Sequence, residues 1–261
     1  MPLIQENLKT GYLGRQVTYL ASTGSTNAEL WRLVDDGRAV PGQLVVTDDQ
    51  RSGKGRAGRR WFSGPGLGLT FSVFLRPLLP LEQLGLLSLA AGVAVVDALA
   101  NEGLQAKLKW PNDILVDGRK LGGILIESRV SDNKPMVVLG VGLNVNEEQA
   151  DFPEELHLTA VSVRMVLMQQ VQREVLLAGI LNRMEELLEG GIGAVVSLWK
   201  DRCAHLNQSM RYHGPAGPIV GRFLGVNAEG QGQLSVGDQI HLVTAGDMDW
   251  IPEPQRSASV S

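Results

Sequence analysis

The sequence predicts an α/β domain followed by a small all-β domain, and two observations support this division. Up to about residue 208, segments with the apolar spacing of helices alternate with short segments typical of strands. From Ser209 onward, short apolar stretches alternate with Gly, Pro, Asn and Asp, which is typical of a small barrel or sandwich. We therefore expect domains over residues 1–208 and 209–253, and a disordered tail over residues 254–261.

Composition limits the classes of protein that need consideration. The chain has 261 residues, of which 44% are hydrophobic, and a formal net charge of −4. This acidic balance argues against a general nucleic-acid binder. The single cysteine, Cys203, excludes an internal disulfide framework and fits a reducing compartment, so we expect a cytoplasmic protein. Polar residues at positions 5–7 interrupt the apolar run that a signal peptide requires.

The first half of the chain predicts two helices and two strands. The first helix follows a hydroxyl cap at Ser25 or Thr26. The Ala- and Leu-rich segment 81–101 is predicted to be a buried helix, because Ser88 and Asp97 break an apolar run that is shorter than the ~20 residues of a membrane span. The predicted elements are residues 27–35 (helix), 43–47 (strand), 69–75 (strand) and 81–101 (helix).

The second half predicts a hairpin, another strand, two helices and the all-β region. Asp117-Gly118 is a favoured pair for a two-residue hairpin loop, so the segments on either side of it are expected to pair. The predicted elements are strands at 114–116, 120–127 and 136–145, helices at 174–188 and 195–207, and strands at 210–212, 219–226, 232–236 and 239–243.

A basic, glycine-rich segment at residues 50–61 reads QRSGKGRAGRRW and contains no acidic residue. Its glycines let backbone N–H groups approach a ligand, and its cations supply charge-assisted hydrogen bonds to phosphate or carboxylate oxygens. We interpret it as a site for an anion larger than one carboxylate, although taken alone it also fits a solvated loop. The cations are Arg51, Lys54, Arg56, Arg59 and Arg60.

Residues 53–58 also match the G-x-G-x-x-G pattern of dinucleotide-binding proteins. That pattern must open a helix, so that the pyrophosphate lies at the helix N-terminus. Here the following residues, 59–68, contain two glycines around Pro65 and are not expected to continue as a helix. A dinucleotide-dependent oxidoreductase is therefore the last of the functions that we consider.

Four further segments carry polar residues of the kind found in binding sites. Ser25-Thr26-Asn27 precedes the first helix, and Lys109-Trp110-Pro111-Asn112-Asp113 surrounds a proline bend. Lys120 begins a strand beside two glycines, and Asn144 lies in the segment GVGLNVN at residues 140–146. Each has a plainer interpretation as a helix cap or a turn when it is considered alone.

In this order, the basic loop and the four segments resemble the biotin protein ligases. The resemblance implies an α+β protein, with a mixed-sheet catalytic domain like those of class II synthetases and a small C-terminal SH3-like β barrel. It also implies two steps: biotin and ATP, with Mg²⁺, form biotinyl-5′-AMP, and biotin then passes to a lysine of an acceptor. The implied partner is the biotin carboxyl carrier domain of a biotin-dependent carboxylase, and a homodimer is an option that the resemblance leaves open.

The resemblance also implies roles for individual residues, and none of them is assigned to a metal. The biotin-binding residues would be Ser25, Thr26, Asn27, Gln50, Lys54, Gly55, Arg56 and Lys120. The ATP-binding residues would be Arg56, Arg59, Trp61, Lys109, Asn112 and Asn144. The catalytic residues would be Lys120, Arg56 and Lys54.

Two features depart from the pattern of that family. Lys54 stands where arginine is usual and Ala57 where a second arginine is frequent, and lysine keeps the charge but lacks the planar guanidinium fork. We therefore expect a looser hold on the adenylate. In addition, about twenty residues precede Ser25, which is too few for the three-helix DNA-binding module of bifunctional members. We expect no binding to an operator or to other nucleic acid.

Two alternatives remain, a lipoate-type ligase and a non-catalytic biotin or nucleotide sensor. The Lys-Trp-Pro-Asn-Asp segment and the C-terminal β region favour biotin over lipoate. Lys120 and the intact glycine spacing argue against a sensor with a degenerate site.

Overall fold

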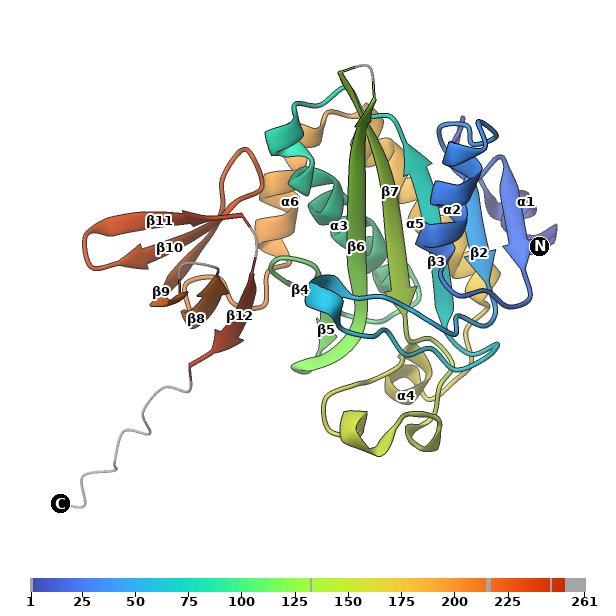
Figure 1. Ribbon diagram of the computed structural model, residues 1–261. Helices are drawn as coiled ribbons and strands as arrows, with labels where there is room; N and C mark the ends of the chain where they lie inside the picture. The colour runs from blue at the N-terminus through green and yellow to red at the C-terminus, as the bar shows by residue number, and fades with distance from the viewer. Residues whose placement is uncertain (1, 132, 215–216, 245, 252–261) are drawn as a thin grey trace.

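The computed structural model describes residues 2–131, 133–214, 217–244 and 246–251, so the tail predicted at 254–261 lies outside the described residues. The chain is mixed α+β and contains a seven-stranded and a five-stranded sheet (Figure 1). The helices are α1 (Pro2–Asn7), α2 (Thr26–Asp35), α3 (Gly85–Asn101), α4 (Val163–Leu167), α5 (Arg173–Glu189) and α6 (Val195–Asp201). The strands of the larger sheet are β1 (Val17–Leu20), β2 (Leu44–Thr47), β3 (Leu69–Leu75), β4 (Lys107–Lys109), β5 (Asp113–Val116), β6 (Arg119–Ser131) and β7 (Lys134–Leu143).

The larger sheet has the order β1-β2-β3-β7-β6-β5-β4. Its strands pair antiparallel except for β1 and β2, which run parallel, so the sheet is mixed as predicted. Helix α2 covers one face, where Leu30 packs with Phe74 and Val138. Helices α3 and α5 cover the other face, over the neighbouring side chains Val73 and Val137 (Figure 1). Because successive strand residues point to opposite faces, both faces of β3 are buried.

The predicted hairpin at Asp117-Gly118 is confirmed. Val116 pairs with Arg119, which leaves two residues in the loop. Both have positive φ, 48° at Asp117 and 75° at Gly118, the conformation that a type I′ turn requires. The turn sends β6 back along β5, and this places Lys120 near the start of a long central strand.

The long apolar helix is also confirmed as part of the core. Residues Leu81–Asn101, which comprise a 3₁₀ turn and α3, form one segment that is long and apolar enough to cross a membrane by length and composition. However, 72% of its apolar window is buried inside the protein. The helix packs against α5, α6 and β6, so its apolar character is explained by the core that it fills.

The prediction of a helix over residues 195–207 is wrong in its second half, because α6 ends at Asp201. Beyond this point the backbone pairs with β4: the Leu108 N–H donates to the Arg202 carbonyl and the Ala204 N–H to the Leu108 carbonyl, both at 2.8 Å. The spacing of apolar residues reports only local structure, so it does not reveal these contacts to a strand that is distant in sequence. The short elements α1, β1, β4 and α4 were not predicted either.

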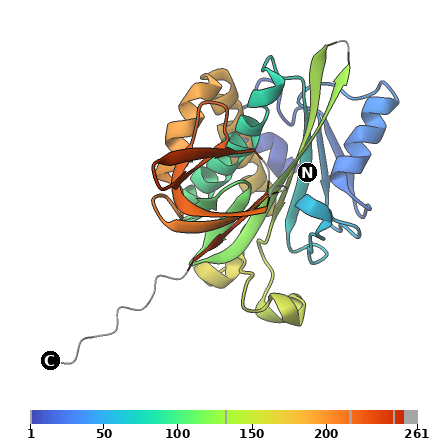
Figure 2. The same cartoon turned by 60° about the vertical axis from the view of Figure 1, so that its left-hand side comes forward.

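The smaller sheet confirms an all-β C-terminal region. Its strands are β8 (Ser209–Gly214), β9 (Gly217–Val226), β10 (Gly232–Val236), β11 (Gln239–Val243) and β12 (Asp247–Trp250), in the order β11-β10-β9-β8-β12. In the described part of the chain this sheet is open, so the predicted closed barrel is not confirmed. Figures 1 and 2 show it beside α6 and β4, at one end of the larger sheet. Phe223 and Met248 join the core cluster that includes Trp110.

Candidate functional site

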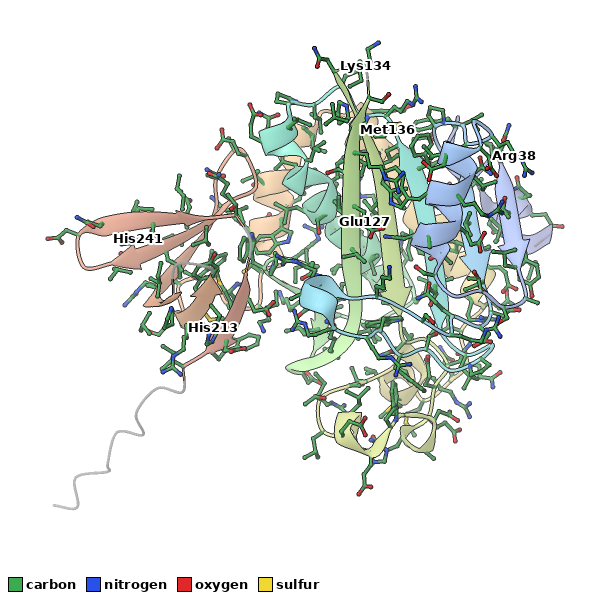
Figure 3. The ribbon with its side chains drawn as sticks, in the orientation of Figure 1. Arg38, Glu127, Lys134, Met136, His213 and His241 are labelled. Carbon is green, nitrogen blue, oxygen red and sulfur yellow. The ribbon has the colours of Figure 1, made fainter. Side chains whose placement is uncertain are left out.

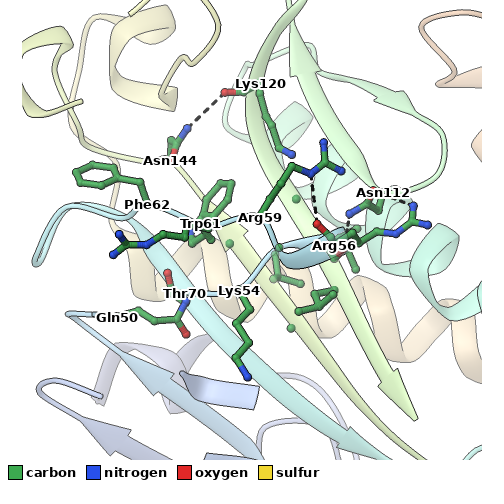
Figure 4. A pocket seen from close by; sticks show the side chains of 18 of the residues that line it. Gln50, Lys54, Arg56, Arg59, Trp61, Phe62, Thr70, Asn112, Lys120 and Asn144 are labelled. Atoms are coloured by element: carbon green, nitrogen blue, oxygen red, sulfur yellow. Dashed lines mark hydrogen bonds between the residues drawn. The ribbon is translucent and has the colours of Figure 1, made fainter. Parts of the chain in front are cut away.

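A cavity of about 310 Å³ brings the predicted site residues together (Figure 4). It lies between the N-terminus of α2, the basic loop, strands β3, β6 and β7, and a loop that includes Phe152 and Leu156. Every site residue that the sequence predicted lines this cavity, with the exception of Lys109. Those that line it are Ser25, Thr26, Asn27, Gln50, Lys54, Gly55, Arg56, Arg59, Trp61, Asn112, Lys120 and Asn144.

The cavity is lined by both cationic and neutral side chains. None of its lining residues within the described ranges is acidic, which is notable in a chain of net charge −4. Elsewhere the lining is apolar or uncharged, with side chains such as Phe71 and Val141 beside the amide of Asn27. The cations that line the cavity are Lys54, Arg56, Arg59, Arg60 and Lys120. Such a lining favours a ligand with a neutral body and an extended anionic end.

The basic loop folds back on itself. Lys54 and Arg60 form an antiparallel bridge, and the Gly55 N–H donates to the Arg59 carbonyl at 2.7 Å. A Cβ added at Gly53 would lie only 2.6 Å from the Trp61 carbonyl oxygen, so a side chain there would displace the returning strand. The loop makes one 3₁₀ turn and then becomes extended at Arg59, which confirms that it does not open a helix.

The neutral end is held by hydrogen bonds around the start of α2. Ser25 occupies the N-cap position but makes no side-chain cap bond; instead the Thr26 N–H donates to Gln50 Oε1 at 2.9 Å. The hydroxyl of Ser72, on β3, lies 2.6 Å from both Thr26 Oγ1 and Asn27 Oδ1. Asn27 Nδ2 donates to Glu127 Oε2 at 3.0 Å. The hydroxyl and amide groups of the Ser-Thr-Asn segment therefore face this part of the cavity in defined orientations.

The cationic end is organised by Lys120 and Arg56. Lys120 Nζ forms an ion pair with Asp113 Oδ1 at 2.5 Å, and the Lys120 N–H donates to the Thr159 carbonyl at 2.6 Å. Arg56 Nη1 lies 3.5 Å from Asn112 Oδ1, and Asn112 Nδ2 donates to the Ile124 carbonyl at 2.7 Å. Burial lowers the pKa of the Arg56 guanidinium from its ordinary value, because desolvation disfavours the charged form.

Lys109 lies outside this cavity. Its Nζ is 4.0 Å from Asp249 Oδ1 and 5.1 Å from the ring centroid of Trp250, so the side chain faces the C-terminal sheet. It lines a neighbouring cavity of about 300 Å³ together with Arg59, which belongs to both cavities. Arg59 Nη2 also pairs with Asp247 Oδ1 at 2.7 Å, and this pair connects the basic loop to β12.

Asn144 is only 4% exposed, and its amide is engaged by backbone. Asn144 Nδ2 lies 3.1 Å from the Val161 carbonyl and 3.4 Å from the Lys120 carbonyl. It thereby fixes the loop of residues 152–160 beside Lys120. This loop contributes Phe152, Leu156, Thr159 and Ala160 to the cavity, and sequence reasoning missed it because its short 3₁₀ turns carry neither a motif nor an apolar period.

Two buried polar groups complete this description: one on Trp61, which the sequence predicted as a site residue, and one on Glu147, which it did not. Trp61 Nε1 is buried and has no hydrogen-bond partner among the described residues, although Trp61 lines the cavity. The Glu147 side chain is fully buried, and its Oε2 accepts a hydrogen bond from the Val145 N–H at 2.7 Å. Burial raises the pKa of Glu147 to about 7. No sequence signal indicated Glu147, because a Glu that follows a strand is usually exposed.

Comparisons with known proteins give one consistent result. Residues 19–144 match the model of the biotin/lipoate A/B protein ligase family. The chain is 34% identical over 255 residues to the bifunctional ligase/repressor BirA of Bacillus subtilis strain 168, a match that covers 94% of this chain and 77% of that protein. It is 33% identical over 261 residues to the biotin–[acetyl-CoA-carboxylase] ligase of Mycobacterium tuberculosis, with 95% of each chain covered.

Solved structures give the same answer. The biotin protein ligase from Aquifex aeolicus in complex with biotin and ATP superposes with a TM-score of 0.76 at 27% identity, and the match covers 92% of this chain and 100% of that one. Identity of one third over nearly the full length of the Mycobacterium tuberculosis protein, together with this likeness of fold, establishes that the chain belongs to the biotin/lipoate A/B protein ligase family.

Proposed function

We propose that the chain is an ATP-dependent biotin protein ligase, which forms biotinyl-5′-AMP and transfers biotin to a lysine of a carrier domain. The observation that carries this proposal is the composition of the main cavity: five cations line it together with neutral polar and apolar side chains, and no described lining residue is acidic. Biotin has a neutral ring system and a carboxylate, and ATP supplies the larger anion. The family and the complexes of its relatives with biotin and ATP support the same assignment.

In this scheme, the ureido ring of biotin lies at the neutral end, against Ser25, Thr26, Asn27 and Gln50. The ring and valeryl chain lie along the apolar lining, and the carboxylate points toward the basic loop. Lys54, Gly55, Arg56 and Lys120 then surround the carboxylate, since they line the cavity where the loop meets β6. A chain of apolar and polar contacts that ends in several cations suits an acid with a long neutral body.

The nucleotide occupies the remaining space around Arg56, Arg59, Trp61, Asn112 and Asn144. The unpartnered Nε1 of Trp61 supplies a hydrogen-bond donor there. Lys109 reaches the nucleotide in this scheme only if its side chain leaves the Trp250 ring.

The first step joins two anions. A carboxylate oxygen of biotin attacks the α-phosphorus of ATP, the bond from that phosphorus to the bridging oxygen breaks, and pyrophosphate leaves with the electron pair. The cations of the cavity offset the repulsion between the reactants and the charge that develops on the oxygens. Lys120 is the cation with the most defined position, because Asp113 holds its Nζ and the Thr159 carbonyl holds its backbone.

The second step requires no nucleophile from the chain. The neutral ε-amine of the acceptor lysine attacks the carbonyl carbon of the mixed anhydride, AMP leaves, and the amine loses a proton as the amide forms. The folded-back basic loop shields the anhydride from water during the interval between the two steps. Cys203, whose pKa burial raises to about 11, takes no part.

Magnesium, which accompanies ATP in such reactions, does not fit a site built by the protein. No group of three or more His, Cys, Asp or Glu side chains in the described residues could hold a metal ion, and the nearest carboxylate to the reacting cations, Asp113, is engaged by Lys120. We propose that the ion arrives bound to the phosphates of the nucleotide, as Mg²⁺ commonly does.

Further parts of the assignment belong to the same proposal. We infer that residues 1–208 form the catalytic unit, that 209–253 form an SH3-like unit, and that the partner is the biotin carboxyl carrier domain of a carboxylase. A single free, partly buried cysteine supports a reducing, cytoplasmic location, and the net charge of −4 supports a function without nucleic acid. Homodimer formation is tested directly by sedimentation at several protein concentrations.

The test of the function is biotin-dependent exchange of labelled pyrophosphate into ATP, with lipoate in place of biotin as the matched control. We expect exchange with biotin alone. A purified carrier domain should then gain biotin, and its Lys→Arg variant should not. Exchange that is equal with lipoate would favour a lipoate-type ligase, and binding of biotin without exchange would favour a sensor.

A further inference from the structure

Two residues that do not line the cavity contact the polar side chains at its neutral end. Ser72, on β3, is fully buried, and its Oγ lies 2.6 Å from both Thr26 Oγ1 and Asn27 Oδ1. Glu127, on β6, points toward α2 (Figure 3), and its Oε2 accepts from Asn27 Nδ2 at 3.0 Å and from Trp31 Nε1 at 3.2 Å. Thr26 and Asn27 are 2% and 6% exposed, so water does not supply these contacts.

The contacts to Glu127 determine which way the Asn27 amide is turned. The indole N–H of Trp31 is only a donor, so Glu127 Oε2 is an acceptor in this network. The Asn27 atom beside the same oxygen must therefore be the nitrogen, since two acceptors at 3.0 Å would repel each other. This leaves Asn27 Oδ1 facing Ser72 and one Nδ2–H of Asn27 not used by Glu127.

The direction of the two hydroxyl protons follows from that orientation. Ser72 Oγ lies 2.6 Å from an oxygen that can only accept, so the single Ser72 proton is donated to Asn27 Oδ1. The equally short contact between Ser72 and Thr26 then requires the Thr26 proton to be donated to Ser72 Oγ. The other acceptor near Thr26 Oγ1, Gln50 Oε1, is more distant at 3.3 Å. With its proton directed to Ser72, Thr26 Oγ1 presents only acceptor lone pairs to the cavity.

Gly140 is what allows Asn27 and Ser72 to meet. It pairs with Ser72 across β3 and β7, and a Cβ added there would collide with Asn27 Oδ1. The first glycine of the segment GVGLNVN therefore provides space for this network.

We propose that Ser72 and Glu127 are positioning residues that set the polarity of the neutral end. Through them the cavity presents an acceptor at Thr26 Oγ1 and a donor at Asn27 Nδ2. A ureido group carries N–H donors beside a carbonyl acceptor, so this fixed pair selects it, whereas a ring without such groups leaves both atoms unpaired. The proposal rests on the function proposed above, since it concerns how that site recognises its acid.

The test compares Ser72→Ala with the wild-type chain in biotin-dependent pyrophosphate exchange. Loss of the Ser72 hydroxyl frees the Thr26 proton and removes the donor to Asn27, so we expect the KM for biotin to rise about tenfold with the KM for ATP unchanged. A second readout uses two biotin analogues, each with CH₂ in place of one ureido N–H. The wild-type chain should discriminate against one of them by about tenfold, and Ser72→Ala should lose most of that discrimination.

Glu127 provides an independent pair of variants if Ser72→Ala does not fold. Glu127→Gln keeps an acceptor oxygen for the N–H groups of Trp31 and Asn27 and should retain the wild-type KM for biotin. Glu127→Leu removes the acceptor, so Asn27 is free to turn either way, and the KM for biotin should rise about tenfold. Unchanged KM and unchanged analogue discrimination in both Ser72→Ala and Glu127→Leu would overturn the proposal. Absence of biotin-dependent exchange by the wild-type chain would instead overturn the proposed function.

Discussion

Lys120 is the residue for which the largest kinetic effect is expected. Its Nζ is held by Asp113 at 2.5 Å and its backbone by Thr159, so the charge is already oriented before substrates arrive. Lys120→Ala should lower the rate of adenylate formation by about 10²–10³-fold, the range found when one preorganised group of a polar site is removed. Single-turnover formation of biotinyl-AMP measures this rate, and a loss of less than fivefold would show that the remaining cations suffice.

We propose that Lys54 governs the retention of the intermediate. It bridges Arg60 within the basic loop, but a lysine lacks the two parallel N–H groups with which arginine binds a carboxylate or phosphate. We expect Lys54→Arg to slow the release of biotinyl-AMP several-fold with little change in the rate of its formation. Release is measured by trapping the free adenylate; indistinguishable release rates in the two proteins would contradict this assignment.

Glu147 makes stability depend on pH. Burial raises its pKa to about 7 from the value of 4.5 expected in the unfolded chain, so the folded state binds the proton more tightly. The contribution of Glu147 to the free energy of unfolding is therefore greatest below about pH 4.5, and this contribution is lost as the pH rises through 7. Glu147→Gln should remove this loss, which amounts to about 3 kcal/mol at pH 8. The measurement is urea unfolding of both proteins at pH 5 and pH 8. The free energy of unfolding of Glu147→Gln should exceed that of the wild type by more at pH 8 than at pH 5.

At the scale of the elements, strand β7 brings a glycine of the segment GVGLNVN against Trp61 of the basic loop. A Cβ added at Gly142 would collide with the indole ring of Trp61. Gly142→Ala should therefore displace Trp61 and raise the KM for ATP about tenfold, since about 1.4 kcal/mol of binding is lost with one displaced aromatic contact. Gly193→Ala is the matched control, because an added Cβ there has no heavy atom within 4 Å. Equal KM values for ATP in the two variants would show that Trp61 does not contribute to nucleotide binding.

The elements also show which parts of the site could be predicted from sequence. Strand β3 and the hairpin at Asp117-Gly118 were correct because their patterns are local: a run of apolar residues and a turn with a required φ. The basic loop was interpreted as an anion site from its cations and glycines, which also form a local pattern. The loop of residues 152–160 was missed because residues distant in sequence hold it in place, through the backbone of Lys120 and the side chain of Asn144. The direction of Lys109 depends on Trp250, and no local pattern contains that contact.

At the scale of the whole molecule, the two sheets share one core. Trp110, between β4 and β5, is 2% exposed and donates from Nε1 to the Gly230 carbonyl at 3.3 Å. Phe223 on β9 stacks with His205 and lies edge-on to Trp199 of α6. We therefore expect one cooperative unfolding transition for the chain, because neither part can unfold without exposing apolar surface of the other. Calorimetry that resolves two transitions would show that the parts are independently stable.

The concentration of cations in the main cavity has a further consequence for the direction of the reaction. The charges that assemble a carboxylate and a triphosphate also attract the pyrophosphate that leaves, and it carries more charge than the acyl-adenylate that stays. Turnover is therefore coupled to whatever removes pyrophosphate from solution, and inorganic polyanions compete with the nucleotide for the same side chains. In a medium rich in sulfate or phosphate, these ions bind the cations of the cavity, and the rate of adenylate formation falls.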